Sequence, residues 1–93
     1  MKEAIAKDIV EQFKSQYFKI TDESHLHKGH KGVEKVGDTH FRLIIVSDQF
    51  ENLSLVQRQR QVNKVCDTYF KQGLHALALK TYTLSEWRAY HGQ

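Results

Sequence analysis

Apolar residues near the start of the chain recur with the period of a helix. Ile5, Ile9 and Phe13 stand four residues apart, and lysine, glutamate and glutamine fill most of the positions between them. Side chains at this spacing share one face of a helix, so the pattern predicts an amphipathic helix over residues 3–16.

Apolar and polar residues then alternate in two further segments. The alternation covers residues 17–24 and returns more strongly over residues 39–47, where Phe41, Leu43 and Ile45 share one face. A period of two is typical of strands that have one buried face. We therefore predict two strands that pair as a hairpin with a long connecting loop.

A capping box predicts where the next helix begins. Ser54 is followed three residues later by Gln57, which is the spacing of a reciprocal N-terminal cap. The apolar stripe beyond it extends the helix to about Lys71, and Gly73 supplies a C-cap.

A third strand and a last helix complete the pattern. Apolar and polar residues alternate over residues 75–82, and Thr83 with Glu86 repeats the capping box. We expect a short final helix there, with Leu84 and Trp87 packed inward.

The predicted order of elements is α-β-β-α-β-α. A strand that returns after a helix lies parallel to its neighbour through a right-handed crossover. The economical arrangement is an α+β fold in which helices cover one face of a mixed three-stranded sheet. We expect a single domain over residues 1–93.

Composition narrows the class of protein without naming a function. The 93 residues carry 14 Lys and Arg against 11 Asp and Glu, a net charge of +3 that suits phosphate contacts or an acidic partner. Cys66 is the one cysteine, which excludes an internal disulfide and a Cys-rich zinc site. The longest apolar run, Leu43–Val46, is far shorter than the ~20 residues that span a bilayer. Since the N-terminus lacks signal-peptide features, we expect a cytoplasmic protein without membrane contacts.

Histidines concentrate in and beside the predicted loop. His25, His27 and His30 lie in the loop, and His40 follows it. Imidazole binds zinc, copper, iron or nickel, but a zinc site normally needs four fixed ligands, and this segment is rich in glycine. A solvated loop and a metal site both remain open. The Gly29–Gly32 stretch matches the GXXG pattern of RNA-binding KH domains, but there the loop joins two helices, so the match carries little weight.

The predicted helix over residues 54–71 is the most basic element. Its cations are Arg58, Arg60, Lys64 and Lys71. Such a helix could lie against phosphates, with its amide side chains reading base edges. Asp67 interrupts the charge, so an ordinary solvated face is the alternative.

Two individual residues, Cys66 and His75, are expected to have a packing role before a reactive one. Cys66 is in register with Val62 and Phe70, so we expect it to pack as a small buried apolar residue. His75 begins the third strand, a place where a histidine more often packs than reacts. No serine stands in a nucleophile-elbow context and no catalytic triad is evident, so we predict that the chain is not an enzyme.

Several blocks of sequence together resemble the BolA-like family, and its bacterial BolA subgroup in particular. The blocks span about residues 3–88 in the family's order. They are Asp22–His27, Thr39–Phe41, Val46–Phe50, Arg58–Asn63 and Leu74–Thr83, followed by Trp87. Asn52 stands where the family usually has glycine, and Gln59 where an Arg-His-Arg motif is common. Both departures bear only on the surface of the basic helix.

The resemblance implies a class II KH-like fold without a working GXXG loop. It also implies a partnership with monothiol glutaredoxins of the CGFS type, which share a glutathione-coordinated [2Fe-2S] cluster with the family in iron homeostasis or cluster transfer. In the family, one cluster ligand is the histidine that opens the third strand, here His75. The second ligand lies in the loop between the first two strands, where His27 matches and His25, His30 and His40 remain alternatives.

The first function to consider is therefore a non-enzymatic glutaredoxin partner. The isolated chain should bind no cluster, because one thiol and a few imidazoles do not hold a cluster unaided. The alternative is a DNA-binding stress-response transcriptional regulator, whose contacts would be Arg58, Arg60, Lys64 and Lys80. A zinc protein built on the loop histidines is a third interpretation. Alone, the chain is expected to be a monomer or a weak homodimer.

Overall fold

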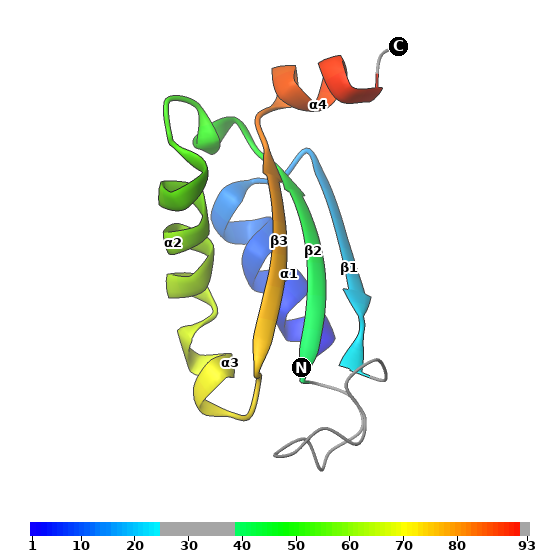
Figure 1. Cartoon of the computed structure of the whole chain (residues 1–93), viewed down its shortest axis with the longest axis vertical. Coiled ribbons are helices and arrows are strands. Elements are labelled where there is room, and N and C mark those ends of the chain that lie inside the picture. Colours follow the sequence, from blue (N-terminus) through cyan, green and yellow to red (C-terminus); the bar gives the residue numbers. More distant parts are fainter. Residues whose placement is uncertain (25–38, 92–93) are drawn as a thin grey trace.

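Three strands form one mixed sheet in the computed structural model, which describes residues 1–24 and 39–91 (Figure 1). β1 (Tyr17–Asp22) pairs antiparallel with β2 (His40–Val46), and β2 pairs in parallel with β3 (Ala76–Tyr82). The strand order is β1-β2-β3, so β1 and β3 are the edges of the sheet. The predicted mixed three-stranded sheet is confirmed.

Two helices lie against one face of this sheet. They are α1 (Lys2–Phe13) and α2 (Leu55–Val65), and in Figure 1 the strands pass in front of α1. α1 ends before the predicted boundary because Lys14 adopts a left-handed conformation, with φ 48° and ψ 51°. Its N–H bonds to the carbonyl of Val10, which caps the helix at this point.

The helix predicted over residues 54–71 is in fact two helices. α2 ends at Val65 and α3 (Asp67–Lys71) follows, with Cys66 between them at φ −91° and ψ 5°. The break keeps the Cys66 side chain buried and lets Phe70 of α3 pack against the core. The prediction of one continuous helix is wrong, because the spacing of apolar residues does not indicate where the backbone changes direction.

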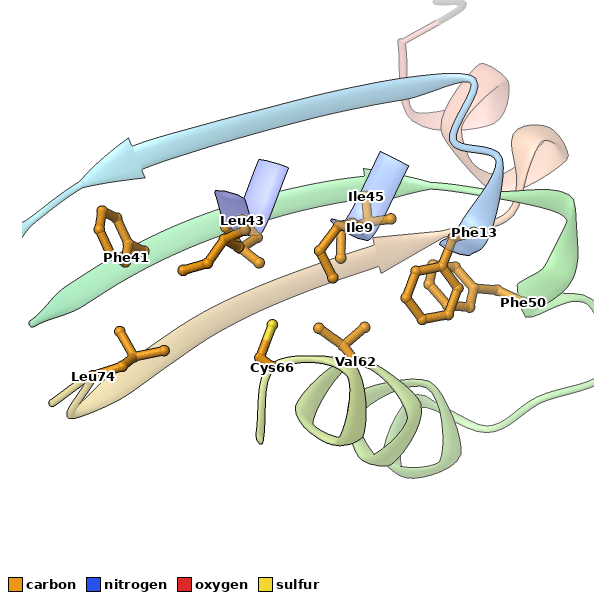
Figure 2. Packing of buried hydrophobic residues seen from close by; sticks show 10 residues of the cluster. Ile9, Phe13, Phe41, Leu43, Ile45, Phe50, Val62, Cys66 and Leu74 are labelled. Atoms are coloured by element: carbon orange, nitrogen blue, oxygen red, sulfur yellow. The ribbon is translucent and has the colours of Figure 1, made fainter. Parts of the chain in front are cut away.

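The core is one apolar layer between the sheet and these helices (Figure 2). A 3-10 helix, η2 (Asp48–Phe50), brings the ring centroid of Phe50 to 5.2 Å from that of Phe13. The buried members of the cluster are Ile5, Ile9, Phe13, Phe41, Leu43, Ile45, Phe50, Val62, Cys66 and Leu74. The apolar faces predicted for the first helix and for the segment 39–47 are thus confirmed.

Both predicted capping boxes are present. The Ser54 hydroxyl accepts a bond from the Gln57 N–H at 3.1 Å, and the Gln57 side chain accepts one from the Ser54 N–H at 2.8 Å. Thr83 and Glu86 make the equivalent bonds, at 3.2 and 2.8 Å, where α4 (Leu84–His91) begins. Each box satisfies backbone N–H groups that a helix leaves without intrahelical partners.

α4 packs away from this core. Its Trp87 stacks on Tyr17, with ring centroids 4.8 Å apart, and makes a tilted contact with Tyr82 at 5.2 Å. Both tyrosines are register partners of Val46, so they stand on the face of the sheet opposite to α1 and α2. The predicted inward packing of Leu84 and Trp87 is wrong, since neither belongs to the core cluster.

Candidate functional site

Two histidines meet where β2 and β3 begin. The His75 N–H donates to the Thr39 carbonyl at 2.8 Å, and the Ala76 N–H donates to the same oxygen at 3.1 Å. This register brings the imidazoles of His75 and His40 together, with ring centroids 5.6 Å apart and planes inclined by 66°. We call these two residues the imidazole pair.

Thr39 and Ser24 hold the strand ends that carry the imidazole pair. The hydroxyl of Ser24 accepts bonds from the N–H groups of Thr39 and His40 at 3.0 and 3.1 Å, and both Ser24 and Thr39 are buried. The Thr39 hydroxyl lies 3.0 Å from His40 Nδ1. A hydrogen bond to one ring nitrogen fixes the direction in which an imidazole faces.

The separation of the two rings suits two ligands of one metal ion. A metal about 2.0–2.1 Å from an imidazole nitrogen lies about 3.2 Å from the ring centre, so two rings at a tetrahedral angle have centres about 5 Å apart. The observed distance of 5.6 Å is close to this value. Two imidazoles are half of a tetrahedral set, and no group of three or more His, Cys, Asp or Glu side chains that could hold a metal occurs within residues 1–24 and 39–91.

The remaining histidines predicted as ligands lie outside the described residues. They are His25, His27 and His30. His27 as the second ligand therefore stays a prediction, and so does a zinc site built on the loop histidines. Of the alternatives for the second ligand, His40 is the one whose place beside His75 the structure gives.

Arg60 and Lys64 form an exposed basic pair on α2, one helical turn apart. Among the ion pairs of the described residues, none involves either side chain. Gln61 lies beside them and lines, together with Lys64, a cavity of about 540 Å³ between α1 and α2. Exposed cations without a carboxylate partner can neutralise phosphates.

Arg58 on the same helix has a structural role. Its side chain is 7% exposed, and its guanidinium donates to both carboxylate oxygens of Glu86 at 2.7 and 3.1 Å. It also donates to the carbonyls of Leu53 and Thr81 at 3.1 and 3.2 Å. The prediction of Arg58 as a nucleic-acid contact is corrected here, because these bonds hold its guanidinium inside the fold, between α2, β3 and α4.

The same contacts set the ionisation of Glu86. The hydrogen bond from Arg58, followed by the bond from the Thr83 backbone, lowers the pKa of this carboxyl from 4.5 to about 2. The pair is therefore ionised throughout the physiological range, and it ties the start of α4 to α2.

Two other cations lie apart from the basic pair. Lys80 is exposed on the edge strand β3 and lines a cavity of about 230 Å³ with Gln59 of α2. Lys71 at the end of α3 forms an exposed ion pair with Asp67 at 2.9 Å. Because a neighbouring carboxylate offsets its charge, Lys71 is a weaker candidate for a phosphate contact than the basic pair.

Cys66 is buried, as predicted. Burial first, and the charge of Asp8 second, raise the pKa of its thiol from 9.0 to about 11. Because the thiolate is the reactive form, we expect iodoacetamide to alkylate the folded protein at pH 8 about 100-fold more slowly than the urea-unfolded chain. Mass spectrometry of timed samples measures both rates, and equal rates would contradict the assignment of Cys66 as an unreactive core residue.

The fold and these surfaces define a small α+β protein with an imidazole pair at the start of two parallel strands and a basic pair on one helix. A family model described as BolA-like protein matches residues 9–86. The chain belongs to the BolA-like family, which confirms the resemblance seen in the sequence. This family is non-enzymatic, so membership also confirms that the chain is not an enzyme. Within the described residues, no helix is long and apolar enough to cross a membrane.

Relatives of the chain match nearly all of it. A protein of Haemophilus influenzae named DNA-binding transcriptional regulator BolA is 34% identical over 89 residues, which is 96% of this chain and 82% of the relative. The Escherichia coli protein of the same name is 31% identical over 87 residues, which is 94% of this chain and 79% of that protein. The solved structure of the BolA domain of SufE1 from Arabidopsis thaliana has a TM-score of 0.84 and 34% identity, covering 91% of this chain and 93% of that one. These matches confirm the predicted fold.

Proposed function

We propose that this protein is a cytoplasmic DNA-binding transcriptional regulator whose α2 helix contacts the phosphate backbone. The observation that carries the proposal is the exposed basic pair, Arg60 and Lys64, which makes no ion pair within the described residues. Relatives that are 31, 33 and 34% identical bear the name DNA-binding transcriptional regulator. Their name supports the proposal, and α2 offers a surface of matching chemistry.

α2 combines the two kinds of contact that a DNA-binding helix needs. Each phosphate that a cation neutralises releases counterions, which favours binding whatever the base sequence. Gln61 and Asn63 are exposed amides on the same helix, and amides can form paired hydrogen bonds with adenine in the major groove. Arg58 contributes indirectly, because its bonds to Thr81 and Glu86 fix the position of α2.

The double variant Arg60→Ala, Lys64→Ala tests this role. Loss of two phosphate contacts should weaken binding to duplex DNA of every sequence and reduce the slope of log K against log salt by about two. Fluorescence anisotropy at several salt concentrations measures both quantities.

Lys71→Ala is the matched control, because Lys71 is an exposed lysine that already has a carboxylate partner. It should leave affinity and salt slope close to those of the unchanged protein. If the double variant behaves like this control, α2 is not the DNA-binding surface.

The imidazole pair favours a second function. We propose that the protein also shares a glutathione-coordinated [2Fe-2S] cluster with a monothiol glutaredoxin of the CGFS type, as the family resemblance implies. His75 is one ligand, and the other is His27 or one of its alternatives, His25, His30 and His40. The donor chemistry fits half of such a site, since two histidines take the place of two cysteines in Rieske clusters. When bound, the cluster supplies one-electron chemistry or iron and sulfide for transfer.

The chain's own part in this function is to present imidazoles rather than thiolates. Its one cysteine is buried, and the pKa of that thiol is raised to about 11, so Cys66 is not available as a ligand. The Thr39 carbonyl fixes the backbone of His75, and the Thr39 hydroxyl contacts the ring of His40. A partner that brings thiolates would complete the ligand set.

A further inference from the structure

The face of the sheet opposite to α1 and α2 carries two distinct rows of side chains. Across one row, Tyr17 is paired with Val46 and Val46 with Tyr82. Across the next row, Lys19 is paired with Ile44 and Ile44 with Lys80. Register partners stand on the same face of a sheet, so an aromatic row lies directly beside a basic row.

α4 extends the aromatic row into a cluster of rings. Trp87 stacks on Tyr17 and contacts Tyr82 at a tilt, and the centroid of Tyr90 is 5.9 Å from that of Tyr82. These contacts leave part of the ring surface open to solvent, since Tyr90 is 68% exposed and Tyr17 is 41% exposed. Exposed aromatic rings that gather in one patch mark interaction surfaces more often than isolated ones do.

The two rows share one hollow. A cavity of about 640 Å³ is lined by the aromatic side chains of β1, β3 and α4 together with Lys19, Ile44 and Lys80. The two lysines are exposed, and no ion pair within the described residues involves either of them. With strands ~4.8 Å apart, the two lysine backbones are separated by ~10 Å across an isoleucine.

Two carboxylates of the neighbouring segments are each paired with an arginine. Glu23 pairs with Arg42 at 3.1 Å, and Glu86 of α4 pairs with the buried Arg58. The hollow is thus positively charged and lined with rings. Proteins that bind single-stranded nucleic acid combine these same two elements: cations that follow the backbone, and rings on which successive bases stack.

We propose that this open face of the sheet binds single-stranded nucleic acid. Unpaired bases stack on Tyr90 and Tyr17, and Lys19 and Lys80 neutralise the adjoining phosphates. The proposed duplex contacts, Arg60 and Lys64, belong to a helix on the other side of the sheet, and Lys80 on the edge strand lies between the two surfaces. A polyglutamate peptide would be attracted by the lysines, but it has no rings that could stack on the tyrosines.

The fluorescence of a tryptophan in the ring cluster can be used to measure binding at this site. Trp87 is the chain's single tryptophan and stands within the ring cluster, so binding of a short thymidine oligonucleotide should change its fluorescence. Tyr90→Leu removes the ring but keeps apolar bulk, and should weaken binding about 5- to 150-fold, the range for one lost stacking contact. Tyr90→Phe keeps the ring and should bind as the unchanged protein does.

The lysine contribution is tested through salt. Lys19→Gln should reduce the slope of log K against log salt by about 0.7, the value for one phosphate contact with a single strand. Lys71→Gln is the matched control and should leave the slope unchanged. Circular dichroism checks that each variant is folded, which the exposure of Tyr90 leads us to expect.

Four results would overturn the proposal. The first is the absence of binding to the oligonucleotide at low salt. The second is equal binding by Tyr90→Leu and Tyr90→Phe. The third is equally tight binding of a polyglutamate peptide, which would indicate a surface selective for charge alone. The fourth is thymidine monophosphate binding as tightly as the oligonucleotide, which would indicate a mononucleotide site. The Arg60→Ala, Lys64→Ala variant should retain single-strand binding, so failure of one proposal does not imply failure of the other.

Discussion

Arg58→Ala is expected to destabilise the protein by about 2–3 kcal/mol. The change removes the bonds to Glu86, Leu53 and Thr81 and leaves two carbonyls without their donor. We place the effect below that of a fully buried ion pair, because the Glu86 side chain is 47% exposed and water can solvate its carboxylate. For a chain of this size the loss lowers Tm by about 10 °C or more.

Arg60→Ala is the matched control for this measurement. Arg60 is two positions along the same helix and exposed, so its loss should change the free energy of unfolding by no more than about 0.5 kcal/mol. Urea unfolding of both variants, followed by circular dichroism, gives the comparison. Equal midpoints for the two variants would show that Arg58 does not hold α2, β3 and α4 together.

The pH dependence of stability gives an independent check on the same contact. The pKa of Glu86 is lowered from 4.5 to about 2 in the folded protein, so the unfolded chain takes up the proton first as pH falls. The stabilisation is fully present above about pH 4.5 and is lost as the pH falls towards 2. Glu86→Gln should therefore be less stable than the unchanged protein at pH 6, and the difference should shrink and disappear near pH 2.

The local features of this fold could be predicted from the sequence, because they depend on neighbouring residues. The capping box of Ser54 and Gln57 and the alternation in β2 both place their side chains by short-range rules. The burial of Arg58 follows from the same short-range rules, although its charge favours an exposed position. Arg58 stands four residues before Val62 and eight before Cys66, so it lies on the buried stripe of the helix, and that spacing was a signal of burial.

Which residues meet at each candidate surface depends on tertiary contacts, and the periodicity of the sequence does not predict these contacts. His40 and His75 meet because β2 and β3 pair in one particular register, and a shift of that register would separate them. Trp87 reaches Tyr17 only because α4 packs on the face of the sheet opposite to α1 and α2. The sequence marks each of these residues as unusual, but the partner of each is set by tertiary packing.

His75→Ala is expected to abolish cluster binding by the heterodimer with a CGFS glutaredoxin. His75 is fixed at the start of β3 by the bond from its N–H to the Thr39 carbonyl, and the imidazole beside it, His40, is held by the contact of its Nδ1 with the Thr39 hydroxyl. The measurement is visible circular dichroism after reconstitution with glutaredoxin, iron, sulfide and glutathione. The unchanged protein without glutaredoxin should show no cluster spectrum.

Variants of the second ligand then separate the alternatives. If His40 is the ligand, His40→Ala removes the cluster, and Thr39→Val, which takes away the hydroxyl beside His40 Nδ1, lowers the affinity about 10- to 100-fold. If His27 is the ligand, His27→Ala weakens the cluster and perturbs its spectrum, while Thr39→Val has little effect. His91→Ala is the control, because His91 stands in α4, far along the chain from the strand ends, and contacts Trp87. A normal spectrum and normal cluster stability in His75→Ala would exclude His75 as a ligand, whatever the other variants show.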